Sequence, residues 1–399
     1  MRIYRDFLRT PYAGRLLGGT LLGRLPNSMG GLSIVLFVRA HDGGYTLAGV
    51  LSAVWVVAMA VGQPVLGRAM DRLGQPRILL AGALAAAAGF TGIALIGLDP
   101  LPITVLAVVV AGFATPPLEA GLRALWPAVL PGPAQVRTAY SLDAAAQELI
   151  FTTGPLLVVA AAVVSTETAL IVTGLLGVAG TFVVTSSRPS RRWRGEPRVA
   201  HWAGPLRSTG LRVLMTALAF VGLALGVISV AVVTYADARH LSSASGLLLT
   251  ANAAGALCGG LVYGARAGRL PLPVLLTGLA AGYLPLALAP GLPVMIALAF
   301  LAGIFLAPTL ATSFTLVDGL APRGTVTEAF AWLVTAMASG AALGSALAGV
   351  MGDLTGVHGA FACAGAGGLL ALGVILLGRR TLHADPEKEH EQVAAEMTR

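Results

Sequence analysis

Twelve apolar stretches follow one another along this chain of 399 residues, and each is long enough to cross a bilayer. A helix needs about 20 apolar residues to span the hydrocarbon core. The chain reaches that length over residues 15–39, 45–66, 76–98, 101–127, 138–164, 167–187, 209–234, 243–265, 271–289, 292–317, 326–351 and 357–378. Only 11% of the residues are charged, against about 25% in a soluble domain. Because each stretch is continuously apolar instead of alternating, we expect an all-α membrane protein and not a barrel.

Basic residues are distributed unevenly among the gaps between these stretches. With the N-terminus in the cytoplasm, 22 of the 26 Lys and Arg residues fall in cytoplasmic segments. Arg39 and Arg239 fall in external segments, and Arg24 and Arg123 lie within apolar stretches. This is the positive-inside pattern. It predicts a multi-pass protein with both termini in the cytoplasm, and the Arg-, Ala-, Gly- and Val-rich composition indicates a bacterial cell membrane. The basic N-terminal segment runs directly into the first stretch, without the features of a cleaved signal peptide.

The same composition argues against several other classes of protein. The net charge of +8 lies in short gaps, with no basic face interleaved with aromatic residues, so we expect no nucleic-acid partner. Cys258 and Cys363 lie inside apolar runs, and the histidines lack the spacing of metal ligands, so neither a disulfide framework nor a metal site is expected. The phosphate-binding sequence of ATP-driven pumps is absent. No nucleophile with a general base stands out, so we expect neither an enzyme nor a cofactor.

The longest internal gap divides the chain into two similar halves. The sequence predicts an N-terminal six-helix bundle over 1–187, a basic cytoplasmic linker over 188–208, a C-terminal six-helix bundle over 209–380 and a charged cytoplasmic tail over 381–399. Residues of the same type recur at matching places in the two halves. Gly154 and Gly344 are 190 residues apart, and Pro117 and Pro308 are 191 apart. A duplicated six-helix unit is the architecture of many secondary transporters.

The gap between the second and third stretches, GRAMDRLGQPR, contains a recognisable motif. Its pattern Gly-x-x-x-Asp-Arg-x-Gly-x-x-Arg is carried by Gly67, Asp71, Arg72, Gly74 and Arg77. In sequence and position this motif resembles the signature of the major facilitator superfamily, and the resemblance extends over essentially the whole chain. The corresponding loop of the second half keeps Gly260 but lacks the acid.

The resemblance implies twelve transmembrane helices in two pseudo-symmetric six-helix bundles that expose a central site to each side of the membrane in turn. In the superfamily the signature loop is a latch between the halves on the cytoplasmic side. Asp71 and Arg72 are therefore expected to hold the outward-open state. A charged loop that only fixes the topology is the alternative.

Charged residues inside membrane helices are costly and tend to mark transport pathways or structural ion pairs. They gather in the first half, at Arg24, Glu119, Arg123, Asp143 and Glu148. Glu119 and Arg123 are four residues apart and share one helix face. Arg24 and Glu148 each lie about 15 Å from the cytoplasmic ends of their stretches, at 1.5 Å per residue. Since the first and fifth helices are neighbours in the superfamily, we expect these two side chains to meet.

Two arginines cannot fully balance three acids in this cluster. A buried carboxyl without a full cationic partner can bind a proton near neutral pH, as a proton-coupled carrier requires. Glu148 is the preferred coupling residue and Glu119 the second, whereas the shallower Asp143 is expected to be a structural partner or a gate residue. The alternative is that these pairs only hold helices together.

Two further sets of residues complete the predicted site. Gly154 and Pro155 resemble, in part, an element of the superfamily's antiporters, whereas Gly340 and Gly344 form a small-residue face suited to close helix packing. A substrate cavity is predicted around Asn252, Phe305, Phe330 and Trp332. Ordinary packing is the alternative for each of these four.

The preferred interpretation is a proton-coupled exporter of small apolar or amphipathic molecules, because the second half offers few hydrogen-bonding groups. Its expected partners are a small-molecule substrate, protons and the lipid bilayer, with the protein acting as a monomer. A permease for a polar metabolite such as a sugar or an organic acid is the first alternative. A non-transporting membrane scaffold or sensor is the second.

Overall fold

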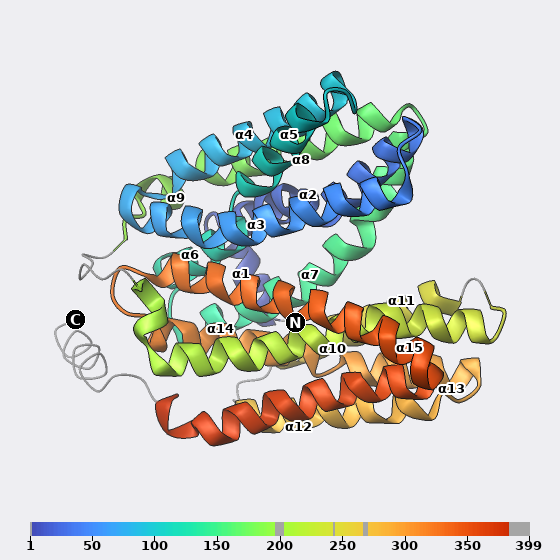
Figure 1. Ribbon diagram of the computed structural model, residues 1–399. Helices are drawn as coiled ribbons and strands as arrows, with labels where there is room; N and C mark the ends of the chain where they lie inside the picture. The colour runs from blue at the N-terminus through green and yellow to red at the C-terminus, as the bar shows by residue number, and fades with distance from the viewer. Residues whose placement is uncertain (1, 196–202, 242–243, 266–269, 383–399) are drawn as a thin grey trace, which may run out of the picture. The chain divides into compact units, whose positions relative to one another are not determined.

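The computed structural model describes residues 2–195, 203–241, 244–265 and 270–382, and over these residues the chain forms helices and no strand (Figure 1). The first half contains α1 (Arg2–Arg9), α2 (Ala13–Ala40), α3 (Tyr45–Leu73), α4 (Gln75–Ile96), α5 (Leu101–Phe113), α6 (Leu118–Val129), α7 (Pro133–Ala162), α8 (Thr166–Thr185) and α9 (Arg188–Arg192). The second half contains η1 (Gly204–Arg207), α10 (Thr209–Ala238), α11 (Ala244–Ala265), α12 (Leu272–Tyr283), η2 (Leu284–Leu288), α13 (Leu292–Gly303), α14 (Leu306–Leu320), α15 (Val326–Gly378) and η3 (Arg379–Thr381).

These helices account for the twelve expected spans within the described residues. Ten helical segments are long and apolar enough to cross a membrane. One of them contains α15, in which the backbone leaves the helical conformation at Gly356 (φ 69°), so α15 is two spans joined by a sharp turn. The shorter apolar segment Leu272–Leu288 supplies the remaining span.

Two spans expected to be continuous are each broken in the middle. The fourth span consists of α5 and α6, because Pro116 and Pro117 between them have no backbone N–H to donate and cannot continue the helix. The tenth span consists of α13 and α14. Here Pro308 lacks the N–H that would bond to the carbonyl of Ile304, the residue at which α13 gives way to α14.

The chain divides into two compact units that follow its two halves, with two exchanges. Unit 1 contains Met1–Val136, Ala146–Val199 and Phe330–Thr335, and unit 2 contains Arg137–Ala145, Ala200–Ala329 and Ala336–Arg399. The first part of α7 therefore belongs to unit 2, whereas a short part of α15 belongs to unit 1. The predicted linker is partly helical, since it includes α9 and η1, and its residues 196–202 lie outside the described residues.

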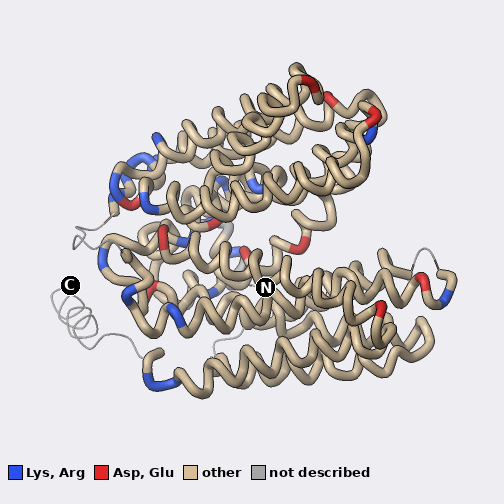
Figure 2. Tube along the Cα trace, in the orientation of Figure 1, with Lys and Arg blue, Asp and Glu red and all other residues tan. Residues whose placement is uncertain are grey.

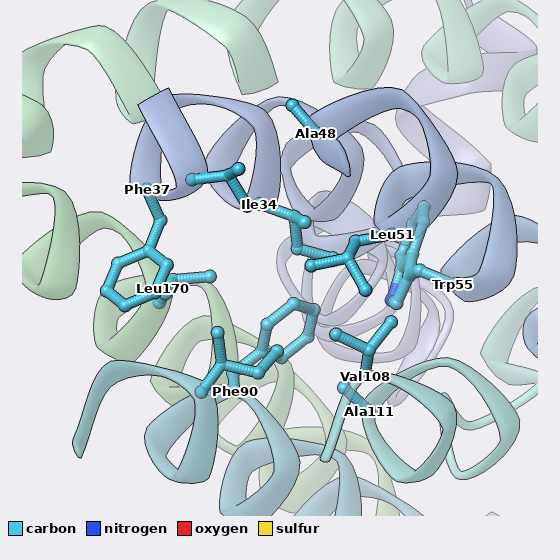
Figure 3. Close-up of a cluster of buried hydrophobic side chains, with 11 residues drawn as sticks. Ile34, Phe37, Ala48, Leu51, Trp55, Phe90, Val108, Ala111 and Leu170 are labelled. Carbon is cyan, nitrogen blue, oxygen red and sulfur yellow. The ribbon is translucent and has the colours of Figure 1, made fainter. Parts of the chain in front are cut away.

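The core of unit 1 is built from large apolar side chains of five helices (Figure 3). Phe37 of α2, Trp55 of α3, Phe90 of α4, Val108 of α5 and Leu170 of α8 are all buried in it. Apolar side chains also cover the outside of the helices, as at Leu95, which is 79% exposed. A bilayer would cover such side chains, so the interior is distinguished by close packing and not by apolar character.

In unit 2, glycines bring the helix backbones close together. A Cβ atom on Gly340 or Gly344 of α15 would overlap the carbonyl oxygens of Ala219 and Leu223 on α10. The contact is reciprocal, because Gly226 of α10 lies against the backbone of α15 in the same way. Small residues permit such close approach between membrane helices.

Candidate functional site

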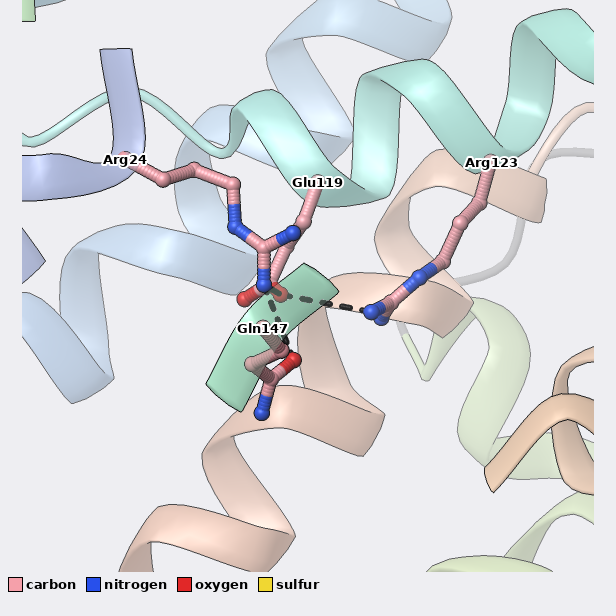
Figure 4. Close-up of polar contacts among 4 residues, drawn as sticks. All are labelled: Arg24, Glu119, Arg123 and Gln147. Atoms are coloured by element: carbon pink, nitrogen blue, oxygen red, sulfur yellow. Dashed lines mark hydrogen bonds and ion pairs between the residues drawn. The ribbon is translucent and has the colours of Figure 1, made fainter. Parts of the chain in front are cut away.

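A buried cluster of charges joins three helices of unit 1 (Figure 4). Arg24 of α2 donates from Nη2 to Oε2 of Glu119 on α6, at 2.5 Å, and to Oε1 of Gln147 on α7, at 2.9 Å. Arg123, one turn after Glu119 on α6, donates to the same carboxylate oxygen at 3.3 Å. One carboxylate thus binds two guanidinium groups from different helices.

The cluster is almost completely removed from solvent. The exposed fractions are 4% for Arg24, 5% for Glu119 and 1% for Arg123. Isolated charges at this depth would be very unfavourable, and they are tolerated because the pairs and hydrogen bonds offset the loss of hydration. Removing any one partner therefore breaks a buried ion pair or hydrogen bond.

The break between α5 and α6 positions Glu119. Because α6 begins at Leu118, Glu119 lies in its first turn, where the helix dipole favours a negative charge. Gln63 of α3 donates from Nε2 to the carbonyl of Thr115 inside the break, at 3.2 Å. This bond satisfies a backbone group that the interrupted helix would otherwise leave unpaired in the membrane.

The expected contact between Arg24 and Glu148 is not formed. Gln147 takes that place, because successive residues point about 100° apart around a helix and only one of the two faces α2. Glu148 is half-buried, and no ion pair joins it to a described residue. Both arginines bind the carboxylate of Glu119.

Asp143 is fully buried and lies in the part of α7 that belongs to unit 2. Neighbouring residues of this part hold it to the helices of unit 2. Tyr140 donates to Oδ2 of Asp318 on α14 at 2.7 Å, and Thr138 donates to the carbonyl of Gly264 on α11 at 3.1 Å.

Buried and half-buried acids also lie in helices of the second half, in addition to those expected in the first. Glu328, in the first turn of α15, is 1% exposed, and Asp318 is half-buried in α14. Both lie near helix ends, where the apolar stretches that define the spans begin or stop, so hydropathy alone does not mark them as residues of a span. The position of Glu328 three residues into a span was the signal available in the sequence.

The signature motif forms the tight connection between α3 and α4. Gly74 adopts φ 86°, a conformation that favours glycine, and lets the chain turn directly from one helix into the next. Within the motif Gly67 and Asp71 are buried, whereas Arg72 and Arg77 are exposed. The role of Asp71 and Arg72 as a latch stays a prediction.

Gly154 of α7 lies directly against Ser28 of α2, and a Cβ atom there would overlap the Ser28 hydroxyl. That hydroxyl is 3.0 Å from the carbonyl oxygen of Ile150, one turn earlier on α7. Pro155 follows within the same helix. These residues join the helices that carry Arg24 and Gln147.

The four predicted cavity residues are not gathered in one described pocket. In unit 2, Phe305 lines an apolar pocket of about 300 Å³, whereas Asn252 is buried and donates to the carbonyl of Ala299 at 3.1 Å. In unit 1, Phe330 is buried and packs against Arg123, whose guanidinium carbon is 6.0 Å from the ring centre. Trp332 is half-buried, and its Nε1 has no hydrogen-bond partner among the described residues.

Over the described ranges, no group of three or more His, Cys, Asp or Glu side chains is placed to hold a metal ion. The cluster itself consists of one carboxylate, two guanidinium groups and one amide, joined by charged hydrogen bonds.

The helices and their buried charges define a multi-pass helical membrane protein of the transporter type. The family profile of the Major Facilitator Superfamily matches residues 16–270 and 214–398, and the chain belongs to this family. Its members are transporters and not enzymes. No protein with a curated description matches the chain at a significant level.

Solved structures of the same family share the fold at low sequence identity. A bacterial homologue of the iron transporter ferroportin, in its outward-facing state, is 16% identical with a TM-score of 0.74, and the match covers 91% of this chain and 98% of that one. The human organic anion transporter MFSD10 is 16% identical, with a TM-score of 0.63 and coverage of 90% and 99%. The E. coli fucose:proton symporter FucP is 13% identical, with a TM-score of 0.68 and coverage of 93% and 98%.

Proposed function

We propose that this protein is a proton-coupled exporter of small apolar or amphipathic molecules in a bacterial cell membrane. In this proposal the halves 1–187 and 209–380 rock against each other and expose a central site to each side of the membrane in turn. Inward movement of protons drives outward movement of the substrate. Both termini lie in the cytoplasm, and the protein acts as a monomer.

The buried cluster around Glu119 is the observation that carries the proposal. Its charges come from α2 and α6, and α7 contributes Gln147, so any change in the charge of the cluster alters the forces between three helices. Intramembrane charges of this kind commonly mark proton pathways. Glu119 is held by two arginines.

Glu148 is the acid that we expect to take up and release the proton. It follows Gln147 on α7 and makes no ion pair with a described residue. Uptake of a proton by Glu148 would change the charge of α7 one residue away from the side chain that holds Arg24. Proton binding and helix movement would thereby be coupled.

The nature of the substrate is proposed from the composition of the helices. Apolar residues dominate the second half, which favours an amphipathic cargo over a heavily hydroxylated one. The aromatic residues Phe305, Phe330 and Trp332 are proposed contacts for its apolar part, and Asn252 a proposed polar contact. The fucose:proton symporter and organic anion transporter of similar fold make a polar solute the alternative.

Inverted membrane vesicles with an imposed proton gradient test the proposal. The unaltered protein should move members of a panel of lipophilic cations and antibiotics when the gradient is applied. Glu148→Gln should remove the dependence on the gradient. Glu167→Gln is the matched control, because Glu167 is a half-exposed acid of the same unit that pairs with His41 at 3.2 Å.

Transport of sugars or organic acids alone would favour the permease, and no flux of any solute by a folded protein would favour the scaffold. A Glu148→Gln variant with an unchanged pH dependence would exclude Glu148 as the coupling residue.

A further inference from the structure

An exposed basic patch lies at the end of unit 1 where α8 leads into α9, and Figure 2 shows Lys and Arg gathered there. We name it the α9 patch and define it by its four exposed arginines, Arg188, Arg191, Arg192 and Arg194. Ser187 caps the short helix by accepting a bond from the backbone N–H of Ser190, at 3.4 Å. The cap fixes the arginines on a defined turn of backbone.

No acid among the described residues pairs with the arginines of the α9 patch. No carboxylate lies within ion-pair distance of its four arginines among the described residues. Arg194 donates only to backbone carbonyls, those of Arg191 and Trp193, at 2.9 and 2.8 Å. Four guanidinium groups are therefore available to an external anion.

The location of the α9 patch indicates which kind of anion it would bind. The apolar helix α8 ends at Thr185, three residues before Arg188, so the arginines lie where a membrane span meets the headgroup layer. Trp193 is half-buried beside them, and tryptophan is typical of that layer. Clusters of four or more basic residues directly outside a span are typical of sites for anionic lipids, and guanidinium groups bind phosphate through paired hydrogen bonds.

A chain of contacts connects the α9 patch to the charge cluster. Ser190, buried beneath the arginines, donates from Oγ to Oε1 of Gln75 at 3.4 Å. Gln75, at the start of α4, donates from Nε2 to the carbonyl of Gly121 at 2.9 Å, and its side chain is fully buried. Gly121 lies on α6 between Glu119 and Arg123. The side chain of Gln75 thus links α9 to the helix that carries the cluster, and α9 also contacts that helix directly.

We propose that the α9 patch binds the phosphate headgroups of anionic phospholipids in the adjacent leaflet, and that bound lipid stabilises α6 through Ser190, Gln75 and Gly121. The lipid is a regulatory partner and is distinct from the transported substrate. Binding and stability are measured without transport, so the proposal can fail independently of the proposed exporter function.

The purified full-length protein tests lipid binding directly. Native mass spectrometry compares the binding of phosphatidylglycerol and phosphatidylcholine to the unaltered protein and to Arg191→Gln/Arg192→Gln. Each arginine near a membrane surface contributes about 1 kcal/mol, so the double variant should bind phosphatidylglycerol at least about tenfold more weakly. Binding of phosphatidylcholine should be unchanged.

Arg379→Gln/Arg380→Gln is the matched control, because it removes an adjacent, exposed arginine pair at the end of α15 in unit 2. It should retain most of the phosphatidylglycerol affinity. An equal loss in both double variants would overturn the proposal, because it would reveal a diffuse charge effect and no site. Unchanged affinity in Arg191→Gln/Arg192→Gln would overturn it as well.

Hydrogen exchange tests the connection to α6. Phosphatidylglycerol should slow amide exchange in α6 of the unaltered protein, and this slowing should be lost in Gln75→Leu while lipid binding persists. Ser190→Ala, a milder change in the same chain of contacts, should reduce the slowing. If both variants keep the full slowing, the connection through Gln75 is wrong.

Discussion

Glu119 binds two arginines that reach it from different helices, and its removal should leave both without their shared counter-charge. Breaking a buried ion pair by removing one partner costs about 3–5 kcal/mol. Glu119→Gln should therefore lower the thermal unfolding temperature of the purified protein clearly. Glu167→Gln should change it little, because the pair of Glu167 with His41 is about one-third exposed and such pairs contribute at most about 1 kcal/mol.

A Glu119→Gln protein as stable as the unaltered one would mean that the arginines do not depend on this carboxylate. The double variant Glu119→Gln/Arg123→Gln gives a further check, because it also removes one of the two guanidinium groups that pair with Glu119. It should recover part of the stability that the single variant loses.

The sequence predicted which charged residues form the buried cluster, but it did not predict which residue of α7 binds Arg24. The four-residue spacing of Glu119 and Arg123 correctly placed them on one helix face, and their ion pair follows from it. The spacing within one helix cannot say which of two adjacent residues on another helix faces Arg24. That choice depends on the rotation of α7 against α2, where Gly154 lies against Ser28, and it brought Gln147 instead of Glu148 to Arg24.

Close packing of α15 on α10 leads to a prediction at the scale of the helix. Gly344→Ala adds a methyl group that would overlap the carbonyl oxygen of Leu223, which is backbone and cannot move aside alone. Overpacking of this kind costs about 1–3 kcal/mol. Gly349→Ala is the matched control on the same helix, because its methyl group meets no atom within 4 Å.

Thermal unfolding of the two purified variants distinguishes them. Gly344→Ala should unfold at a lower temperature than the unaltered protein, and Gly349→Ala at the same or a higher temperature, since alanine favours helix over glycine. Equal unfolding temperatures for the two would contradict the close contact between α15 and α10.

The number of membrane-spanning helices could be predicted from the lengths of the apolar stretches, whereas the breaks within two of these helices could not. Each stretch was long enough to span, so the twelve spans could be counted from hydropathy alone. The breaks at Pro116 and Pro117 and before Pro308 lie inside uninterrupted apolar runs, where hydropathy carries no signal. Proline chemistry predicts an interruption there, but whether a helix kinks or stops depends on neighbours such as Gln63, which satisfies the carbonyl of Thr115.

The arrangement of the chain across the membrane leads to a prediction for the whole molecule. Single cysteines placed at Arg194 and Arg380, in a variant without Cys258 and Cys363, should both react with a membrane-impermeant reagent from the cytoplasmic side. The reason is that these arginines follow the sixth and twelfth spans, and an even number of spans returns the chain to its starting side. Reaction from opposite sides would contradict the twelve-span topology.

Movement of the two halves against each other is the central claim of the proposed mechanism, and electron spin resonance distance measurements test it most directly. Spin labels at Arg77 and Arg380, exposed residues of unit 1 and unit 2, report the separation of the two units. We predict two distance populations in lipid, with proportions that change with pH in the unaltered protein and do not change in Glu148→Gln. A single distance that is the same at every pH and with every solute would contradict alternating access.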